Sequence, residues 1–337
     1  MTPHKAARLT EMRVVVVGPG ALGCLIAASI AVKLKFKAEG KSPHELWLLD
    51  HQRERADLLA RNGLVLEEGE KKFRCPVHIT CDPAEIGTAD ILFLCVKSPD
   101  VQQGLTHVAP LLMADSILLT LQNGIGHLDY LEARRNGFTA IGVTAQGANL
   151  TGPGQVRHAG EGLTRIGFMG SYPQGGAEKL KMAAALLTEA DIPTEVVNNI
   201  LDYVWAKLLV NVGINALTAI NNCANGELLD SAASRGKMAD AVREAESVAR
   251  AKGIILDEDP VAMAYKVCEA TRSNISSMLQ DVRKMRATEI DSINGAIVKE
   301  ARRLGIFVPV NEMLVQAVKK IEQDYEIMSD SSEKTVS

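Results

Sequence analysis

The chain has 337 residues, of which 47% are apolar, and a formal net charge of −4. That length suits one large domain or two ordinary ones, and the apolar content is ample for a sizeable core. The near-balanced charge argues against nucleic acid or an anionic membrane surface as a partner.

Residues 12–32 form an apolar stretch after a basic segment, which raises the question of a signal peptide or membrane anchor. Three glycines and a proline within residues 18–23 would break a spanning helix near its middle. The same letters fit a strand, a turn and a helix better. Residues 1–11 are predicted to be a loose tail.

Apolar strands alternate with helices over the first 140 residues. Strands are predicted at 13–17, 45–49, 77–81, 91–96 and 116–121, and helices at 21–35, 52–62 and 101–112. Continuous apolar strands that alternate with helices indicate a mostly parallel sheet covered on both faces. Residues 33–45 lengthen the first crossover and are predicted to be a solvated loop.

The pattern changes after residue 140. Glycine-punctuated segments there are typical of antiparallel strands, and they precede a helix at 178–190 and a last strand at 193–197. Beyond this point only helices are predicted, at 200–221, 235–252, 258–280, 282–304 and 311–325. We therefore expect an α/β domain over 12–197, an all-helical domain over 198–327 and a disordered tail over 328–337.

Six cysteines are spread along the chain, and no two of them form a C-x-x-C pair. The pattern predicts neither a zinc knuckle nor a disulfide framework, and it leads us to infer a reducing, cytoplasmic compartment. The histidines are scattered without metal-ligand spacing, and no G-x-S-x-G elbow of a serine hydrolase occurs.

A glycine-rich turn, GPGALG (18–23), follows the first strand and opens the first helix. In this context Gly18 permits the tight turn, Gly20 lets the backbone approach a pyrophosphate, and Gly23 lets the helix pack close to the strand. The helix N-terminus then offers free N–H groups to the phosphates. The motif predicts dinucleotide binding rather than an ordinary glycine turn.

The residues after the second strand leave the choice of nicotinamide cofactor open. Asp50 stands where an acid binds the ribose 2′-hydroxyl of NAD, and its charge would repel a 2′-phosphate. Arg53 and Arg55 follow within the next helix, and an arginine there can hold the 2′-phosphate of NADP.

Polar residues also follow two other strands. Lys97 stands just after the strand 91–96, and Asn123 just after the strand 116–121. Ligands of open α/β sheets bind at the carboxyl ends of strands, so both residues are candidates for cofactor contact. The alternatives are a solvated strand end for Lys97 and a plain turn residue for Asn123.

The helix predicted at 200–221 carries a polar stripe, which we define as Lys207, Asn211 and Asn215. These residues are four apart, so they share one face of an otherwise apolar helix. An unpaired buried charge or amide is costly, so the stripe must face solvent or a polar guest. Two further polar clusters, at 274–281 and 286–294, would by themselves suit a solvated helix face.

Several motifs together resemble the ketopantoate reductase (2-dehydropantoate 2-reductase) family over residues 12 to about 326. They are GPGALG (18–23), VK (96–97), QNG (122–124), KLLVNVGIN (207–215), NCANGEL (222–228), NISSMLQD (274–281) and RATEIDSING (286–295). The resemblance implies a Rossmann-type N-terminal domain, a helical C-terminal domain and an active site in the cleft between them. It also implies NADPH-dependent reduction of 2-dehydropantoate to (R)-pantoate, a step towards pantothenate and coenzyme A.

The resemblance assigns roles by matching motifs. The catalytic pair falls on Lys207, the general acid, and Glu289. Substrate-binding residues fall on Asn211, Asn215, Asn225, Asn274 and Ser277. Cofactor contacts fall on Gly18, Pro19, Gly20, Ala21, Leu22, Gly23, Lys97, Asn123, Ala148 and Glu289, to which the residues after the second strand add Asp50 and Arg53.

Some features depart from the family or leave alternatives. Asp50 stands where NADPH users often carry a basic residue, so NAD remains an alternative cofactor. A related 2-oxo acid or opine-type reductase and a non-catalytic NADP(H) sensor are alternative functions, although a sensor gains nothing from Lys207. The expected partners are a small 2-oxo acid and, in a homodimer, a second copy, with no nucleic acid, membrane or metal.

Spacing within the last motifs predicts a helix break. Ser277 and Glu289 are twelve residues apart, roughly 18 Å along one straight helix. They cannot both contact a molecule as small as pantoate unless the helix breaks between them, and residues 282–286 are the predicted place for a break. A substrate at Ser277, with the cofactor or Lys207 near Glu289, fits this spacing better.

Overall fold

A computed structural model describes residues 12–34, 44–132 and 137–333 of the chain. The chain divides into two compact units, Met1–Gln122 with Tyr130–Ile200, and Asn123–Asp129 with Leu201–Ser337. We call them the α/β unit and the helical unit. The predicted tail at 1–11 and most of the predicted loop at 33–45 fall outside the described residues.

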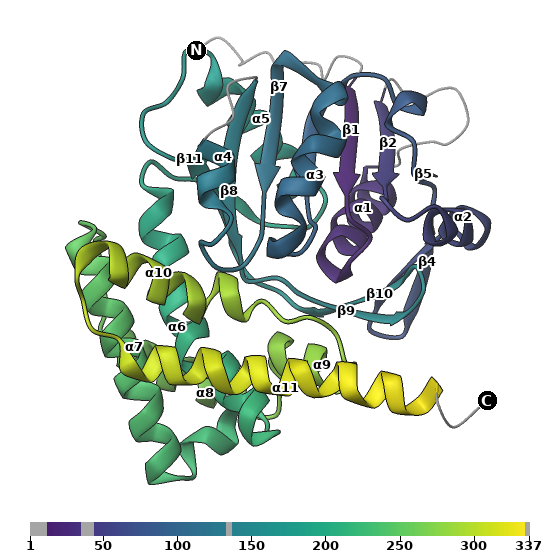
Figure 1. The fold of residues 1–337 in the computed structure, drawn as a ribbon. Helices are drawn as coiled ribbons and strands as arrows, with labels where there is room; N and C mark the ends of the chain where they lie inside the picture. The colour runs from purple at the N-terminus through teal and green to yellow at the C-terminus, as the bar shows by residue number, and fades with distance from the viewer. Residues whose placement is uncertain (1–11, 35–43, 133–136, 334–337) are drawn as a thin grey trace. The chain divides into compact units, whose positions relative to one another are not determined.

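The α/β unit is built on an eight-stranded sheet (Figure 1). Its strands are β1 (Met12–Val17), β2 (His44–Leu49), β5 (His78–Thr80), β6 (Ala89–Leu94), β7 (Leu112–Thr120), β8 (Phe138–Thr144), β11 (Thr164–Phe168) and β12 (Thr194–Val196). Their order is β12-β11-β8-β7-β6-β1-β2-β5, and neighbours are parallel except β8 and β11. The strand order reverses beside β1, where ligands of such sheets bind.

A second, four-stranded sheet joins β3 (Leu64–Glu68), β4 (Lys71–Cys75), β9 (Gly147–Gly152) and β10 (Gln155–Gly160) in the order β4-β3-β10-β9. The sequence did not predict the β3–β4 hairpin. Four of the five residues of β4 are not buried, so the strand has no apolar run to reveal it. Pairing with β3 holds it instead.

Helix α1 (Ala21–Lys33) contacts strands of both sheets. Nine of its residues are buried, which explains why this helix is apolar on all sides. The segment that resembled a membrane anchor, residues 12–32, is therefore a buried strand, a turn and a core helix of the α/β unit, as predicted. The other helices of this unit are α2 (Arg53–Asn62), α3 (Val101–Val108), α4 (Leu128–Glu132), whose first two residues belong to the helical unit, and α5 (Gly176–Glu189).

The helical unit packs around its own apolar core. Its helices are α6 (Ile200–Asn221), α7 (Ala232–Ala251), α8 (Pro260–Ala270), α9 (Ser277–Arg283), α10 (Asn294–Leu304) and α11 (Pro309–Glu333), with the short turns η4 (Asn225–Leu229) and η5 (Ile290–Ser292) (Figure 1). By length and composition α6 could cross a membrane, but 72% of its most apolar window is buried inside the protein, as in a core helix.

Two long helices predicted for this unit are wrong. The segments predicted as 258–280 and 282–304 contain non-helical stretches between α8 and α9 and between α9 and α10. Ser276 caps α9 by accepting a hydrogen bond from the N–H of Leu279, which starts a new helix there. Met285 has a φ of 49°, which ends it.

The predicted break at 282–286 is thus confirmed. By contrast, α11 continues to Glu333, into the segment predicted to be a disordered tail, and 334–337 lie outside the described residues. The predicted fold class, a Rossmann-type α/β unit with a mostly parallel sheet followed by helices, is confirmed.

Candidate active site

The glycine turn closes tightly against its neighbours at two positions. Gly18 has a φ of 93°, a left-handed conformation that favours glycine. A Cβ on Gly23 would lie 2.0 Å from the carbonyl oxygen of Gly18, so no side chain fits there. These contacts fix where α1 begins relative to the end of β1.

The same turn is open where a phosphate would approach. Among the atoms that the structure describes, a Cβ on Gly20 would meet only the Cys95 carbonyl oxygen, at 3.9 Å, and Gly20 is exposed. No side chain of the described ranges caps the N-terminus of α1, and the first helical hydrogen bond is donated by the N–H of Cys24 to the carbonyl oxygen of Gly20. The earlier N–H groups of the helix can therefore bind an anion, so the turn fits a dinucleotide.

A pocket lies beside this turn within the α/β unit. It is lined by Val17, Gly18, Leu49, His51, Val96, Asp100, Gln103, Gly104 and His107. These residues come from the ends of β1, β2 and β6 and from α3 and the turn before it, so the pocket lies where the strand order reverses.

Asp50 is fully buried at the end of β2 and is paired with Arg55. Arg55 Nε donates to one carboxylate oxygen at 2.5 Å and Nη2 to the other at 2.6 Å. The backbone N–H of Gln52 also donates to Asp50, at 3.1 Å. Arg55, which the sequence offered as a phosphate ligand, thus neutralises Asp50 instead, whereas Arg53 is exposed and makes no ion pair within the described residues.

Two further predicted cofactor contacts belong to the same unit. Lys97 is half-buried just after β6, whose end is tied to β1 by the N–H of Cys95 donating to Val17 at 2.8 Å. Ala148 is half-buried in β9 and packs against the core of the α/β unit. Both therefore lie on the framework that carries the glycine turn.

The helical unit assembles a chain of three polar side chains. Lys207 Nζ donates to Asn123 Oδ1 at 2.9 Å, and Asn123 Nδ2 donates to Glu289 Oε2 at 3.2 Å. Asn123, predicted as a cofactor contact at a strand end, thus belongs with the two predicted catalytic residues. Its amide ties an ammonium to a carboxylate, a hydrogen-bonded arrangement suited to controlling a proton.

Burial sets the acidity of Lys207. Desolvation lowers the pKa of its ammonium from 10.5 to about 8, although the negative charge of Glu289 opposes that change. An acid whose pKa lies near neutral pH can both hold a proton and give it up. A pKa near 8 is compatible with the predicted role of Lys207 as a general acid.

The other two members of the polar stripe lie within α6, Asn211 half-buried and Asn215 6% exposed. Their side-chain amides have no hydrogen-bond partner among the residues that the structure describes. Within the described residues the protein leaves the bonding capacity of these two amides unused, which a site for a polar guest requires, and their role in substrate binding stays a prediction.

The 274–277 turn lies at the far end of the stripe. Thr218, one turn beyond Asn215, hydrogen-bonds the Ser276 hydroxyl at 2.7 Å. The neighbouring Asn274 and Ser277 are exposed, and no protein partner of either side chain occurs in the described part of the chain. Thr218 extends the stripe at helical spacing, a signal the sequence analysis overlooked.

Asn225 lies against the same turn. Its backbone N–H donates to the Asn274 carbonyl at 3.0 Å, and its side-chain Nδ2 donates to Thr271 Oγ1 at 2.9 Å. The Oδ1 atom is buried without a hydrogen-bond partner among the described residues, so it is an acceptor for a donor that this part of the chain does not supply.

The predicted site residues thus form two groups. Residues 18–23, Asp50, Arg53, Lys97 and Ala148 belong to the α/β unit, whereas Asn123, Lys207, Asn211, Asn215, Asn225, Asn274, Ser277 and Glu289 belong to the helical unit. Glu289 is linked to Lys207, at the head of the stripe, by the hydrogen bonds of Asn123. Ser277 lies at the other end, because its neighbour Ser276 hydrogen-bonds Thr218. Within the described ranges no cluster of three or more His, Cys, Asp or Glu could hold a metal ion.

Comparisons with known proteins place the chain in one family. Residues 14–171 match the family model described as Ketopantoate reductase PanE/ApbA, and residues 199–322 match that of its C-terminal domain. A 2-dehydropantoate 2-reductase of Halobacterium salinarum is 36% identical over 93% of this chain and all of its own length. One of Archaeoglobus fulgidus is also 36% identical, over 92% of this chain and 98% of its own.

Solved structures agree with the sequence matches. A PanE/ApbA family ketopantoate reductase from Ralstonia eutropha has a TM-score of 0.82 and 31% identity, over 94% of this chain and 100% of its own. A D-mandelate dehydrogenase in a ternary structure with NADH and anilino(oxo)acetate has a TM-score of 0.82 and 27% identity, over 94% of this chain and 99% of its own. The two family models cover most of the chain, which therefore belongs to the ketopantoate reductase family of oxidoreductases.

Proposed function

We propose that the chain catalyses reduction of 2-dehydropantoate to (R)-pantoate in pantothenate and coenzyme A biosynthesis, with Lys207 as the general acid. The observation that carries the proposal is the Lys207–Asn123–Glu289 chain at the head of a stripe of unpartnered amides. The family's curated relatives named 2-dehydropantoate 2-reductase support the same reaction.

Lys207 acts on the carbonyl oxygen of the substrate. A nicotinamide cofactor, when bound, supplies hydride to C2. As charge develops on the oxygen, the Lys207 ammonium stabilises it and then transfers a proton to it. Asn123 keeps the ammonium in place, and Glu289 favours its protonated form before each turnover.

The amides and the serine orient the substrate. 2-Dehydropantoate offers a carboxylate, a ketone and a terminal hydroxyl, and an amide can donate to the first two and accept from the third. Asn211 and Asn215 follow Lys207 along α6, and Asn225, Asn274 and Ser277 lie around the turn at the other end of the stripe. Holding the ketone at a fixed place relative to Lys207 accounts for part of the rate.

We propose NADPH as the cofactor. Asp50 would oppose a 2′-phosphate, but its carboxylate is already neutralised by two hydrogen bonds from Arg55. Arg53 is exposed at the first position of α2, and its guanidinium can bind a phosphate through two hydrogen bonds. NADH is the alternative, supported by its presence in the structure of the related D-mandelate dehydrogenase.

The reaction is tested by following nicotinamide absorbance with 2-dehydropantoate and each cofactor. The matched control substrate is 3,3-dimethyl-2-oxobutanoate, which lacks only the terminal hydroxyl. We expect 2-dehydropantoate to have the higher kcat/KM, because a site built to bond a hydroxyl leaves buried polar groups unpaired without it. Equal kcat/KM values would contradict the assigned substrate.

A second candidate substrate class is tested in the same assay. The D-mandelate dehydrogenase relative favours an aryl 2-oxo acid, so phenylglyoxylate is compared with 2-dehydropantoate. Faster turnover of phenylglyoxylate would replace the proposed substrate while keeping Lys207 as the acid. No turnover of any 2-oxo acid would instead support a non-catalytic role.

Cofactor choice is tested by Arg53→Ala, with Arg61→Ala as the matched control. Both arginines are exposed on α2, one in its first turn and the other in its last. We expect Arg53→Ala to raise the KM for NADPH and to leave that for NADH unchanged, while Arg61→Ala changes neither. A wild-type enzyme that prefers NADH at equal concentration would show that Asp50 determines the choice.

The proposal also includes a cytoplasmic location and a homodimer. All six cysteines are free thiols, which suits a reducing compartment. Leu304, Phe307 and Met313 expose apolar surface around the start of α11, which a second copy could cover. Light scattering on the protein as it elutes from a size-exclusion column measures the mass of the particle in solution. The mass of a single chain would contradict the homodimer.

A further inference from the structure

The 123–129 segment is a short excursion of the chain into the helical unit. The chain leaves the α/β unit after Gln122 and returns to it at Tyr130. Asn123, the first residue of this segment, makes the hydrogen bonds to Lys207 and Glu289. Whatever holds the 123–129 segment therefore also places the amide that contacts the proposed acid.

The middle of the segment is held by Ser292. The N–H of Ile125 donates to the Ser292 carbonyl at 3.0 Å, and a Cβ on Gly124 would lie 2.0 Å from that oxygen. Ser292 ends η5, and its own N–H donates to the Glu289 carbonyl at 3.0 Å. The turn that holds the segment is thus the turn that carries Glu289.

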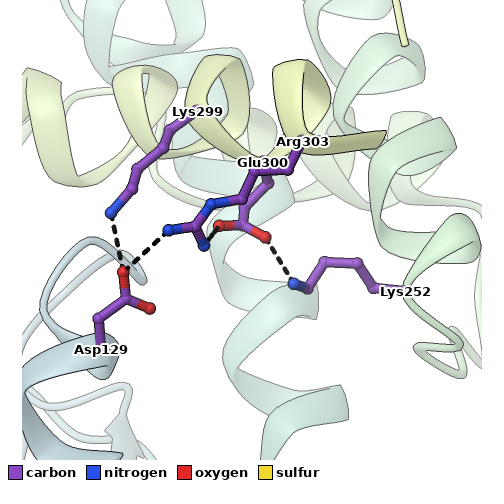
Figure 2. A network of polar contacts seen from close by, with 5 residues as sticks. All are labelled: Asp129, Lys252, Lys299, Glu300 and Arg303. Atoms are coloured by element: carbon purple, nitrogen blue, oxygen red, sulfur yellow. Dashed lines mark hydrogen bonds and ion pairs between the residues drawn. The ribbon is translucent and has the colours of Figure 1, made fainter. Parts of the chain in front are cut away.

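The end of the segment is held by ion pairs, shown in Figure 2. Asp129 Oδ2 accepts from Lys299 Nζ at 2.8 Å and from Arg303 Nη2 at 3.3 Å. Both cations come from α10, which begins two residues after Ser292. Glu300 accepts from Arg303 at 2.7 Å and from Lys252 at 2.5 Å, which fixes the guanidinium and links α10 to the end of α7.

These ion pairs are unlike a stabilising core contact. The side chains of Asp129, Lys299 and Arg303 are each about half exposed, at 51%, 51% and 52%. A single exposed ion pair contributes little to stability because water competes for both partners, but several charges joined in one network, as here, can contribute measurably. Their consequence is geometric: one carboxylate shared by two cations on α10 fixes the end of the segment that begins with Asn123.

We propose that Asp129 is a positioning residue for the reduction: paired with Lys299 and Arg303, it holds the 123–129 segment so that the Asn123 amide stays between Lys207 and Glu289. This inference rests on the proposed function of Lys207 as the acid. The inference predicts that the Asp129 carboxylate, which contacts no reacting atom, nonetheless determines where the Lys207 ammonium is held for proton transfer.

The test compares Asp129→Ala with Asp129→Glu, which keeps the charge, and with Glu246→Ala as the matched control. Glu246 also accepts two hydrogen bonds from an arginine, Arg250, on the surface of the helical unit, at 2.9 and 2.7 Å. For Asp129→Ala we expect kcat to fall about tenfold with little change in substrate KM, since small misplacements of reacting groups are costly. Asp129→Glu should recover much of the loss, and Glu246→Ala should match wild type.

A pH profile separates positioning from general weakening. Asn123 Oδ1 accepts a hydrogen bond from the Lys207 ammonium, which favours the charged form. If Asn123 is displaced in Asp129→Ala, the fall of kcat at high pH, which we call the basic limb, should therefore begin at a lower pH. Burial lowers the pKa of His127, in the same segment, to about 4, so that side chain stays neutral in this range and does not produce the limb.

A readout that does not need turnover keeps the inference independent of the proposed reaction. The titration of Lys207 is followed by NMR of isotopically labelled lysine side chains, with Lys207→Arg to assign the signal. We expect its midpoint to fall by roughly half a unit or more in Asp129→Ala and not in Glu246→Ala. An unchanged midpoint and unchanged kcat in a folded Asp129→Ala would overturn the inference, whereas a shifted midpoint in a protein that reduces no 2-oxo acid would overturn only the proposed function.

Discussion

The two halves of the candidate site are encoded differently in the sequence. The glycine turn of the α/β unit is contiguous: six residues between a strand and a helix contain its geometry. The proposed proton-transfer group of the helical unit joins Asn123 to Lys207, 84 residues away, and to Glu289, 166 residues away. The first is a property of local backbone, and the second is a property of how distant segments pack.

The difference concerns what each half must provide. A dinucleotide phosphate needs N–H groups and close approach, which backbone conformation supplies without side chains. A reacting carbonyl needs one proton donor at one place, which requires a side chain supported by others. The two halves should therefore respond differently to substitution.

The largest expected effect is on the acid. Lys207→Ala should lower kcat by about 100- to 10,000-fold, the usual contribution of general acid catalysis. Cofactor affinity, measured by quenching of protein fluorescence, should stay unchanged, because the glycine turn belongs to the other unit. Turnover within threefold of wild type would exclude Lys207 as the acid.

A pair of glycine substitutions examines the backbone half. In Gly23→Ala the new Cβ would lie 2.0 Å from Gly18 O, so overpacking should lower stability by about 1–3 kcal/mol and weaken cofactor binding. In Gly20→Ala the new Cβ would meet one described atom, Cys95 O at 3.9 Å, so the variant should have the melting temperature of wild type yet bind cofactor less tightly. Equal melting temperatures for the two variants would contradict this account.

The sequence could predict the local half almost completely. The strand, turn and helix at 12–33 could be predicted from residues that are neighbours in the sequence. The shared face of Lys207, Asn211 and Asn215 could be predicted from the spacing within one helix. Sequence could not predict that Asn123 leaves the α/β unit, because nothing in the 123–129 segment reveals Ser292 and α10 as its partners. Nor could it show that Arg55 pairs with Asp50 rather than remaining free for a phosphate.

The pH dependence sharpens the description of the helical half. If Lys207 is the acid, as proposed, reduction needs its protonated form, and burial lowers its pKa from 10.5 to about 8. We therefore expect log kcat/KM to be level below pH 7 and to fall with unit slope above about 8, about tenfold for each pH unit. Oxidation of pantoate, which needs the neutral amine, should rise over the same range. A basic limb near 10 would show that Lys207 is solvated as an ordinary surface lysine.

The smallest expected effect concerns the substrate-orienting residues. Ser277→Ala removes one hydroxyl from the exposed N-terminus of α9, so it deletes a ground-state hydrogen bond of about 0.5–1.5 kcal/mol. Substrate KM should rise about two- to thirteenfold while kcat changes little, because uniform binding affects KM alone.

Ser276→Ala is the informative contrast to that variant. Ser276 is buried, bonds Thr218 and caps α9, so its loss should lower stability as well as raise KM. An unchanged KM in Ser277→Ala would remove that serine from the substrate site. A raised KM in Ser276→Ala alone would then show that the 274–277 turn contributes through its backbone, as the glycine turn does, and the contrast between the two halves would be smaller than their geometry suggests.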